Sequence, residues 1–166
     1  PDYAVFIVEK EARTAGFAIY FRSIEAPFYL LEYMAIDPAQ RSGGLGNHLF
    51  SRSIEILFGE FGIKPVWIEI DTPSTTHMNT PEHRGERFYR NAGCKRVMGF
   101  NYLLGLKTPH TPPPMSLMVF APDRHTITKA ELRKHIESIY QNVYGRSCRE
   151  PEIDRMFDNV ANTLNL

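Results

Sequence analysis

The sequence has few cysteines, no excess of charge of either sign and no long apolar run. The two cysteines, Cys94 and Cys148, fit neither a disulfide framework nor a zinc pattern, which indicates a reducing, cytoplasmic setting. Lysine plus arginine and aspartate plus glutamate number 19 each, and without a basic cluster this balance disfavours nucleic acid as a partner. No apolar stretch approaches bilayer-spanning length and the N-terminus lacks a signal-like pattern, so no membrane partner is expected.

Patterns for metal or triad chemistry are also missing. Histidines and cysteines do not cluster at metal-ligand spacing, and no Ser/His/Asp or Cys/His arrangement can be argued from the sequence. We therefore predict no metal site. What is present is the composition of an ordinary globular protein, with 43% hydrophobic and 12% aromatic residues in 166, enough for one domain with a real core.

The most informative stretch joins a strand-like run to a glycine-rich turn and a helix. Residues 30–36 are apolar apart from Glu32, which suits a strand buried on at least one face, and Asp37-Pro38 ends it. The following glycines, in residues 41–46, let a backbone turn tightly and approach a ligand closely. A helix begins directly afterwards, so its unpaired N–H groups and positive dipole end would point into the glycine loop and could hold a phosphate. A tight turn without a ligand is the alternative.

The spacing Arg41-x-x-Gly44-x-Gly46 matches neither a Walker loop nor the dinucleotide-binding pattern. It resembles motif A of the GNAT superfamily of acyl-CoA-dependent N-acyltransferases, Q/R-x-x-G-x-G/A, at the same strand-to-helix junction. The preceding segment 34–38 (MAIDP) is similar to that family's strand ending. About 45 residues downstream, segment 88–94 (FYRNAGC) is similar to the superfamily's F-Y-x-x-x-G-F motif.

The order of expected elements matches the GNAT fold from its second to its seventh strand, over roughly residues 3–121. We predict an α/β fold with a mixed central sheet flanked by helices, lacking the superfamily's usual N-terminal strand and helices. The first two strands should form an antiparallel hairpin, and the strands on either side of the first helix should pair in parallel. The predicted strands are Tyr3 to Glu9, Phe17 to Arg22, Tyr29 to Ile36, Val66 to Ile70, Cys94 to Phe100 and Met115 to Phe120, and the helices are Leu45 to about Phe61 and Glu82 to Asn91.

The chain is expected to divide into a GNAT-like acyltransferase domain, residues 1–122, and a C-terminal helical extension, residues 123–166. Thr128 and Glu131 have capping-box spacing ahead of an apolar helical pattern. Pro151 suits the first residue of a second helix that runs to Leu164. This added helical pair lies outside the resemblance, and we expect it to pack on the domain or at the interface of a homodimer.

The resemblance implies acetyl-CoA as the acyl-donor co-substrate and a primary amine of a small molecule as the acceptor. It places the cofactor on main-chain N–H groups of the glycine loop and along the preceding strand edge. There the Met34 N–H would donate to the developing oxyanion. The alternative is that the strand is only core. The implied cofactor-binding residues are Met34, Ala35, Ile36, Arg41, Ser42, Gly43, Gly44, Leu45, Gly46 and Asn47.

Two residues are candidates for proton transfer. Glu32 is the candidate base, because a carboxylate inside an apolar run is costly unless it has a task or a partner. Strand alternation predicts that it shares a face with Met34 and Ile36; a salt bridge is its alternative role. Tyr89 resembles the superfamily's tyrosine acid, which reprotonates the leaving thiolate. Its alternative role is core packing beside Phe88.

Other polar residues are weaker candidates. Glu69 and Asp71 end a parallel strand, where open sheets place ligands, or are a solvated strand end. The acceptor site is expected from loop 72–81 with His77, from the Pro-rich segment 106–114 and from whatever covers the side of the missing helices. His83 is a further weak candidate, and His48 is expected at the surface. The rival functions are a non-catalytic acyl-CoA-binding module and a subunit of a larger acyltransferase assembly.

Overall fold

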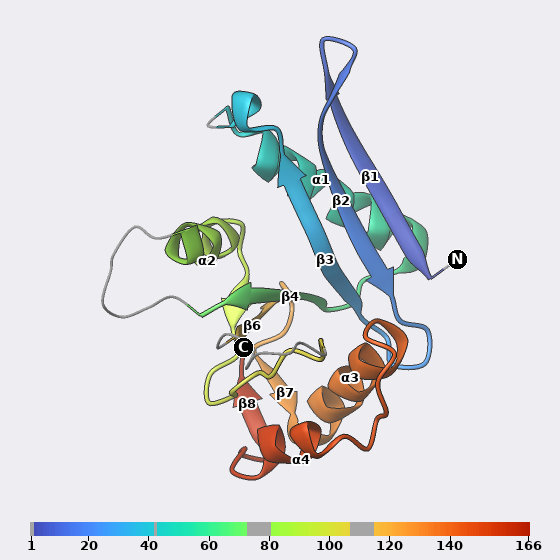
Figure 1. Cartoon of the computed structure of the whole chain (residues 1–166), viewed down its shortest axis with the longest axis vertical. Coiled ribbons are helices and arrows are strands. Elements are labelled where there is room, and N and C mark those ends of the chain that lie inside the picture. The colour runs from blue at the N-terminus through green and yellow to red at the C-terminus, as the bar shows by residue number, and fades with distance from the viewer. Residues whose placement is uncertain (1, 42, 73–80, 107–114) are drawn as a thin grey trace.

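The structure is a computed structural model that describes residues 2–41, 43–72, 81–106 and 115–166. A mixed six-stranded sheet, in the order β1-β2-β3-β4-β6-β5, is flanked by helices and joined by a two-stranded β7-β8 sheet (Figure 1). The predicted α/β class is thus confirmed. The elements are β1 (Tyr3–Lys10), β2 (Arg13–Arg22), β3 (Tyr29–Ile36), η1 (Pro38–Gln40), α1 (Leu45–Phe61), β4 (Val66–Asp71), α2 (Pro81–Asn91), β5 (Lys95–Arg96), β6 (Met115–Phe120), β7 (Thr126–Thr128), α3 (Lys129–Asn142), α4 (Pro151–Phe157) and β8 (Thr163–Asn165).

The sheet is antiparallel except at its centre. β1 and β2 form the predicted antiparallel hairpin, and β2 continues antiparallel to β3. β3 and β4 are parallel, as the strand-helix-strand step predicted, but they pair only from Tyr29 with Val66 to Leu31 with Ile68. Beyond that register no further pairing joins the described residues of β3 and β4. The two strands diverge towards their carboxyl ends, as Figure 1 shows.

A bulge lies in β3 where the divergence begins. Tyr20 of β2 is opposite Leu31, whereas the adjacent Ile19 is opposite Tyr33. Glu32 is therefore the extra residue of β3 and has no partner on β2. A bulge of this kind bends a strand and re-aims the side chains near it.

The bulge overturns the prediction that Glu32 shares a face with Met34 and Ile36. Those two side chains pack in the core under α1, whereas Glu32 is hydrogen-bonded to Tyr3. The ring of Tyr3 packs on Phe21, which belongs to the core on the opposite face of the sheet. The prediction was wrong because period-2 alternation assumes a strand with no inserted residue.

Each face of the sheet has its own core. α1 and α2 cover one face, and α3, α4 and the β7-β8 sheet cover the other (Figure 1). The helical stripe predicted for α1 supplies the first core through Leu49, Phe50, Ile54 and Leu57. In the second, the Trp67 indole N–H of β4 donates a 3.0 Å hydrogen bond to Nδ1 of buried His135 on α3.

Two predicted elements are shorter than expected. The strand predicted for Cys94 to Phe100 is only Lys95–Arg96, and Gly99 further along has a φ of 72°, which interrupts an extended chain. The last helix ends at Phe157 instead of reaching Leu164. Leu164 instead lies in β8, which pairs with β7, and its buried side chain joins the same core from a strand.

Candidate active site

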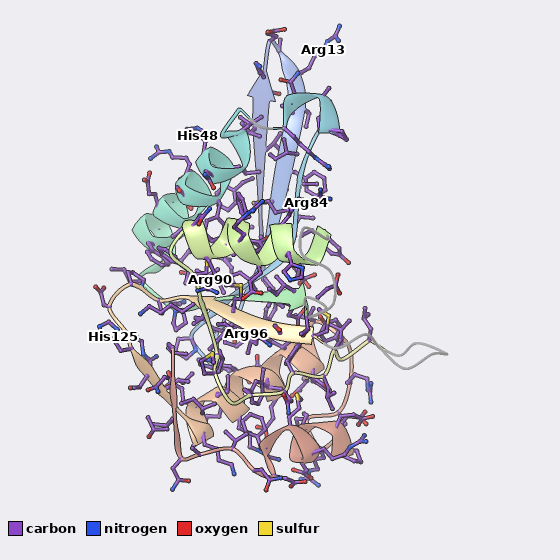
Figure 2. The ribbon with its side chains drawn as sticks, turned by 90° about the vertical axis from the view of Figure 1, so that its left-hand side faces the viewer. Arg13, His48, Arg84, Arg90, Arg96 and His125 are labelled. Atoms are coloured by element: carbon purple, nitrogen blue, oxygen red, sulfur yellow. The ribbon has the colours of Figure 1, made fainter. Side chains whose placement is uncertain are left out.

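The glycine loop and α1 have the local geometry of an anion site. Gly44 is the N-cap of α1 and has a φ of 76°, a left-handed conformation that strains a residue with a Cβ. It has no side chain to cap the helix, so the first N–H groups of α1 can turn to a ligand. His48, one turn into the helix, is exposed on its outer side, as expected (Figure 2).

The turn before Gly44 is tied back to β3. The Asp37 carboxylate accepts a 2.9 Å hydrogen bond from the Ala39 N–H, and the Arg41 guanidinium Nε donates a 3.2 Å hydrogen bond to the Ile36 carbonyl. Arg41 thus shapes the loop through its side chain. Ser42, a predicted cofactor contact, lies outside the described residues.

The two sequence motifs pack against each other. A Cβ added at Gly46 would lie 3.3 Å from Cε2 of Phe88, so the glycine allows α2 to approach the start of α1. Phe50, one turn further along α1, packs edge-on against both Phe88 and Tyr89, with centroid distances of 6.3 and 5.7 Å. Motifs about 45 residues apart in the sequence therefore form one surface.

A cleft of about 350 Å³ opens where β3 and β4 diverge. It brings together the predicted residues Glu32, Met34 and Tyr89. The weaker candidates Glu69 and Asp71 also line it, whereas His83 does not and His77 lies outside the described residues. Among the described residues, the lining consists of Glu32, Tyr33, Met34, Glu69, Ile70, Asp71, Gly85, Tyr89 and Met115. Ala35, Ile36 and the described residues of the glycine loop are not among these lining residues, and they follow Met34 in the sequence.

Glu32, which lines this cleft, has one unsatisfied carboxylate oxygen. Its Oε1 is buried and has no hydrogen-bond partner in the described part of the chain. No ion pair joins Glu32 to a described residue, so the predicted salt-bridge alternative is not found among them. Burial raises the pKa of the Glu32 carboxyl, and a hydrogen bond with Tyr3 offsets part of that rise.

Tyr89 combines core packing with a place in the cleft. Its ring packs on Phe50, while its hydroxyl makes no hydrogen bond to another described residue. Burial raises the pKa of Tyr89, and the nearby Cys94 raises it further. The hydroxyl is therefore protonated at neutral pH.

Glu69 has two tyrosine partners that the sequence did not predict. One carboxylate oxygen accepts a hydrogen bond from Tyr102 and the other from Tyr144. Burial raises the pKa of Glu69, the two tyrosine hydrogen bonds lower it, and the charge of Glu32 raises it. Tyr102 follows β5 and Tyr144 follows α3, and neither lies in a recognisable motif, so no sequence signal pointed to them.

The parallel strand pair, its divergence and the glycine loop at a helix N-terminus belong to an α/β fold, and a helix N-terminus of this kind is suited to an anionic ligand. Residues 1–93 match the model of the acetyltransferase (GNAT) family. This is more than half of the chain, and the protein belongs to that family of acyl-CoA-dependent N-acetyltransferases. No curated protein matches the sequence. Within the described ranges, no helix has both the length and the apolarity required to cross a bilayer.

Solved structures share the fold. A protein from Bacteroides thetaiotaomicron assigned to the GNAT family is 25% identical, with a TM-score of 0.62 over 87% of this chain and 74% of that one. The ribosomal-protein-S18-alanine N-acetyltransferase from Escherichia coli is 21% identical, with a TM-score of 0.54 over 72% and 68%. An acetyltransferase from Bacillus subtilis in complex with CoA is 12% identical, with a TM-score of 0.53 over 72% and 77%. The last two likenesses concern the fold alone.

Proposed function

We propose that the protein transfers an acetyl group from acetyl-CoA to a primary amine of a small molecule by direct attack of the amine. One observation carries this proposal. Glu32 lines the same cleft as Tyr89 and Met34, and its buried Oε1 has no hydrogen-bond partner among the described residues. A buried carboxylate oxygen without a partner is costly, and a ligand that donates a proton to it would remove that cost.

The chain offers a fitting place for acetyl-CoA. The edge of β3 that faces β4 is unpaired beyond Leu31 among the described residues, so main-chain groups of Met34 and Ile36 are proposed to pair with the pantetheine amides. Ala35 lies between them, with its main-chain groups turned towards β2. The left-handed N-cap Gly44 leaves room for a pyrophosphate. The proposed phosphate contacts are Arg41, Gly43, Gly44, Leu45, Gly46 and Asn47. Ser42 is also proposed, on the basis of the sequence alone, because it lies outside the described residues. When bound, acetyl-CoA supplies the acetyl group as a thioester.

In this proposal Glu32 and Tyr89 carry out different proton transfers. Glu32 Oε1 accepts a proton from the ammonium form of the acceptor, and its raised pKa brings it closer to that of an efficient base at neutral pH. The Met34 N–H donates to the oxygen that becomes negatively charged as the new C–N bond forms. Tyr89 gives its hydroxyl proton to the sulfur as the C–S bond breaks and regains one from the attacking nitrogen. The net release is one proton, held by Glu32 until it reaches solvent.

The test is amine-dependent thiol release from acetyl-CoA, measured against a panel of amino acids, polyamines, aminoglycosides and peptides with free N-termini. We expect at least one class to raise thiol release well above the background of hydrolysis. Binding of acetyl-CoA, measured as the rise in melting temperature that it causes, serves as the control. Stabilisation without thiol release from any amine would instead support a non-catalytic acyl-CoA-binding module.

A second candidate function is that of a subunit in a larger acyltransferase assembly. One face of the β1-β2-β3 strands exposes large apolar side chains, with Val5, Ile7 and Tyr33 each at least 60% exposed. Apolar side chains gathered on one sheet face mark interaction surfaces. The mass and the activity of the purified chain alone distinguish the two candidates, because a subunit would be active only with its partner.

A further inference from the structure

Glu69 is held in the cleft by residues from two distant parts of the chain. Tyr102, which is buried and forms a bridge with Met115 of β6, donates its hydroxyl to Oε1. Tyr144, just beyond α3, donates its hydroxyl to Oε2. The carboxylate thereby has both oxygens engaged and a defined orientation.

The position of Tyr144 is fixed by its surroundings. Its ring packs edge-on against Tyr140 of α3, with centroids 6.3 Å apart. A Cβ added at Gly105 would clash with the Tyr144 ring, so a glycine is required there. Arg146 donates a 3.1 Å hydrogen bond to the Gly105 carbonyl and holds the two segments together. Tyr144 is therefore held in a defined position beside Glu69.

The cleft is lined by three carboxyl groups and by no cationic side chain of the described structure. Glu32, Glu69 and Asp71 line it, and no described lysine or arginine does. None of the three forms an ion pair with a described residue. Tyrosine hydroxyls supply hydrogen bonds but no compensating charge. Glu32 and Glu69 are partly buried and Asp71 is exposed. Partly buried carboxylates without a cation are stabilised by a cationic ligand.

We propose that Glu69, positioned by Tyr102 and Tyr144, binds a second cationic group of the acceptor, so that the acceptor is a diamine or a longer polyamine. This inference rests on the proposed function. The reacting amine lies at Glu32, whose Oε1 is free to take a proton, and the distal ammonium lies at Glu69, whose oxygens already accept two hydrogen bonds. Tyr144 then makes the C-terminal extension a contributor to acceptor selection.

Binding tests the inference without turnover. Isothermal titration of the full chain, saturated with CoA, compares 1,4-diaminobutane with 1-aminobutane. We expect the diamine to bind at least about tenfold more tightly, since a hydrogen-bonded charge pair accounts for a difference of this order. Glu69→Gln should abolish that preference. Equal binding of the two amines to the wild type, or an unchanged preference in Glu69→Gln, would overturn the inference.

Turnover separates the roles of the two glutamates. Glu69→Gln should raise KM for 1,4-diaminobutane about tenfold and raise KM for 1-aminobutane, which has no second ammonium group, much less. A loss of kcat with both amines in Glu69→Gln would identify Glu69 as the base and overturn the inference. If no amine gives thiol release while the calorimetric preference for the diamine and its loss in Glu69→Gln persist, the proposed acetyl transfer fails and the diamine site stands.

Two tyrosine variants test the positioning role. Tyr144→Phe removes the hydrogen bond to Glu69 and keeps the ring, so the preference for the diamine should fall severalfold. Tyr140→Phe is the matched control, because its hydroxyl donates a 2.7 Å hydrogen bond to the Leu103 carbonyl and not to Glu69. It should lower the melting temperature and leave the preference unchanged. Equal effects of the two variants on the preference would overturn the role given to Tyr144.

Discussion

The ring of Tyr89 on α2 packs edge-on against Phe50 on α1, with their centroids 5.7 Å apart. The contact fixes the tyrosine relative to the helix that begins at the glycine loop. Aromatic pairs in this arrangement stabilise a fold through the rings alone. The hydroxyl of Tyr89 takes no part in that packing and lies at the cleft, so packing and chemistry can be separated by one substitution.

Tyr89→Phe should keep the fold and lower turnover. The ring contact with Phe50 remains, so we expect the free energy of unfolding to change by less than about 1 kcal/mol. Loss of the proton donor should reduce kcat about 10²-fold or more. Steady-state kinetics measures the change in kcat, and thermal unfolding, as the control, measures the change in stability. Unchanged kcat with intact CoA binding would remove Tyr89 from the mechanism.

The pH dependence of kcat/KM should report Glu32. A base acts in its deprotonated form, so activity falls as the pH drops through the Glu32 pKa. Burial raises that pKa, and the acidic limb should therefore lie above the ordinary glutamate value of about 4.3. Glu32→Gln should lose most of the activity. The activity that remains in this variant should not show the acidic limb. An identical limb in the variant would assign it to another group.

The stability of the protein should fall in acid because of His135. Burial lowers the pKa of His135 to about 4, with Arg124 lowering it and Glu131 raising it. An unfolded histidine has a pKa of about 6.5. Between these values the unfolded chain binds more protons than the folded one. Stability is therefore present above about pH 6.5 and is lost as the pH falls towards 4, by about 3 kcal/mol.

Urea unfolding at several pH values measures this loss. His135→Gln should flatten the dependence, although the variant will be less stable at neutral pH because the Trp67 indole N–H loses its acceptor geometry. A wild-type protein with equal stability at pH 4.5 and pH 7 would contradict the buried, neutral state of His135.

The N-cap Gly44 and the helical Gly59 should respond in opposite directions to alanine. Gly44→Ala places a Cβ at a φ of 76° and should cost about 1 kcal/mol while weakening acetyl-CoA binding. Gly59→Ala lies in the last turn of α1 with no described atom beyond its chain neighbours and the local helix backbone within 4 Å of the added Cβ, and it should stabilise the protein by about 0.5–1 kcal/mol. Chemical unfolding and CoA titration of the pair distinguish a loop effect from a general effect on α1.

The sequence was most informative where a local pattern determines structure. The bounds predicted for β3 and α1 agree with the structure, because an apolar run ending at Asp37-Pro38 and a helical stripe ending at Gly62 are strong local signals. The position of the glycine loop between them followed from the same signals. The family resemblance also rested on this stretch, and it is confirmed.

The rest depended on contacts that no local pattern encodes. The bulge at Glu32 is a single inserted residue, visible only in the pairing with β2, and it moved that carboxylate to the other face of the sheet. The partners of Glu69 come from Tyr102 and Tyr144, which are brought together by tertiary packing. Leu164 suited a helical spacing equally well, and only its pairing in β8 decided its state.

The central claim is that the cleft transfers an acetyl group with Glu32 as the base. The most direct test is the rate of amine-dependent thiol release at saturating acetyl-CoA, in the wild type and in Glu32→Gln. We predict release that requires an amine, and a fall of about 10²-fold or more in the variant while acetyl-CoA binding is retained. Equal rates in the two proteins at the same pH would contradict the account.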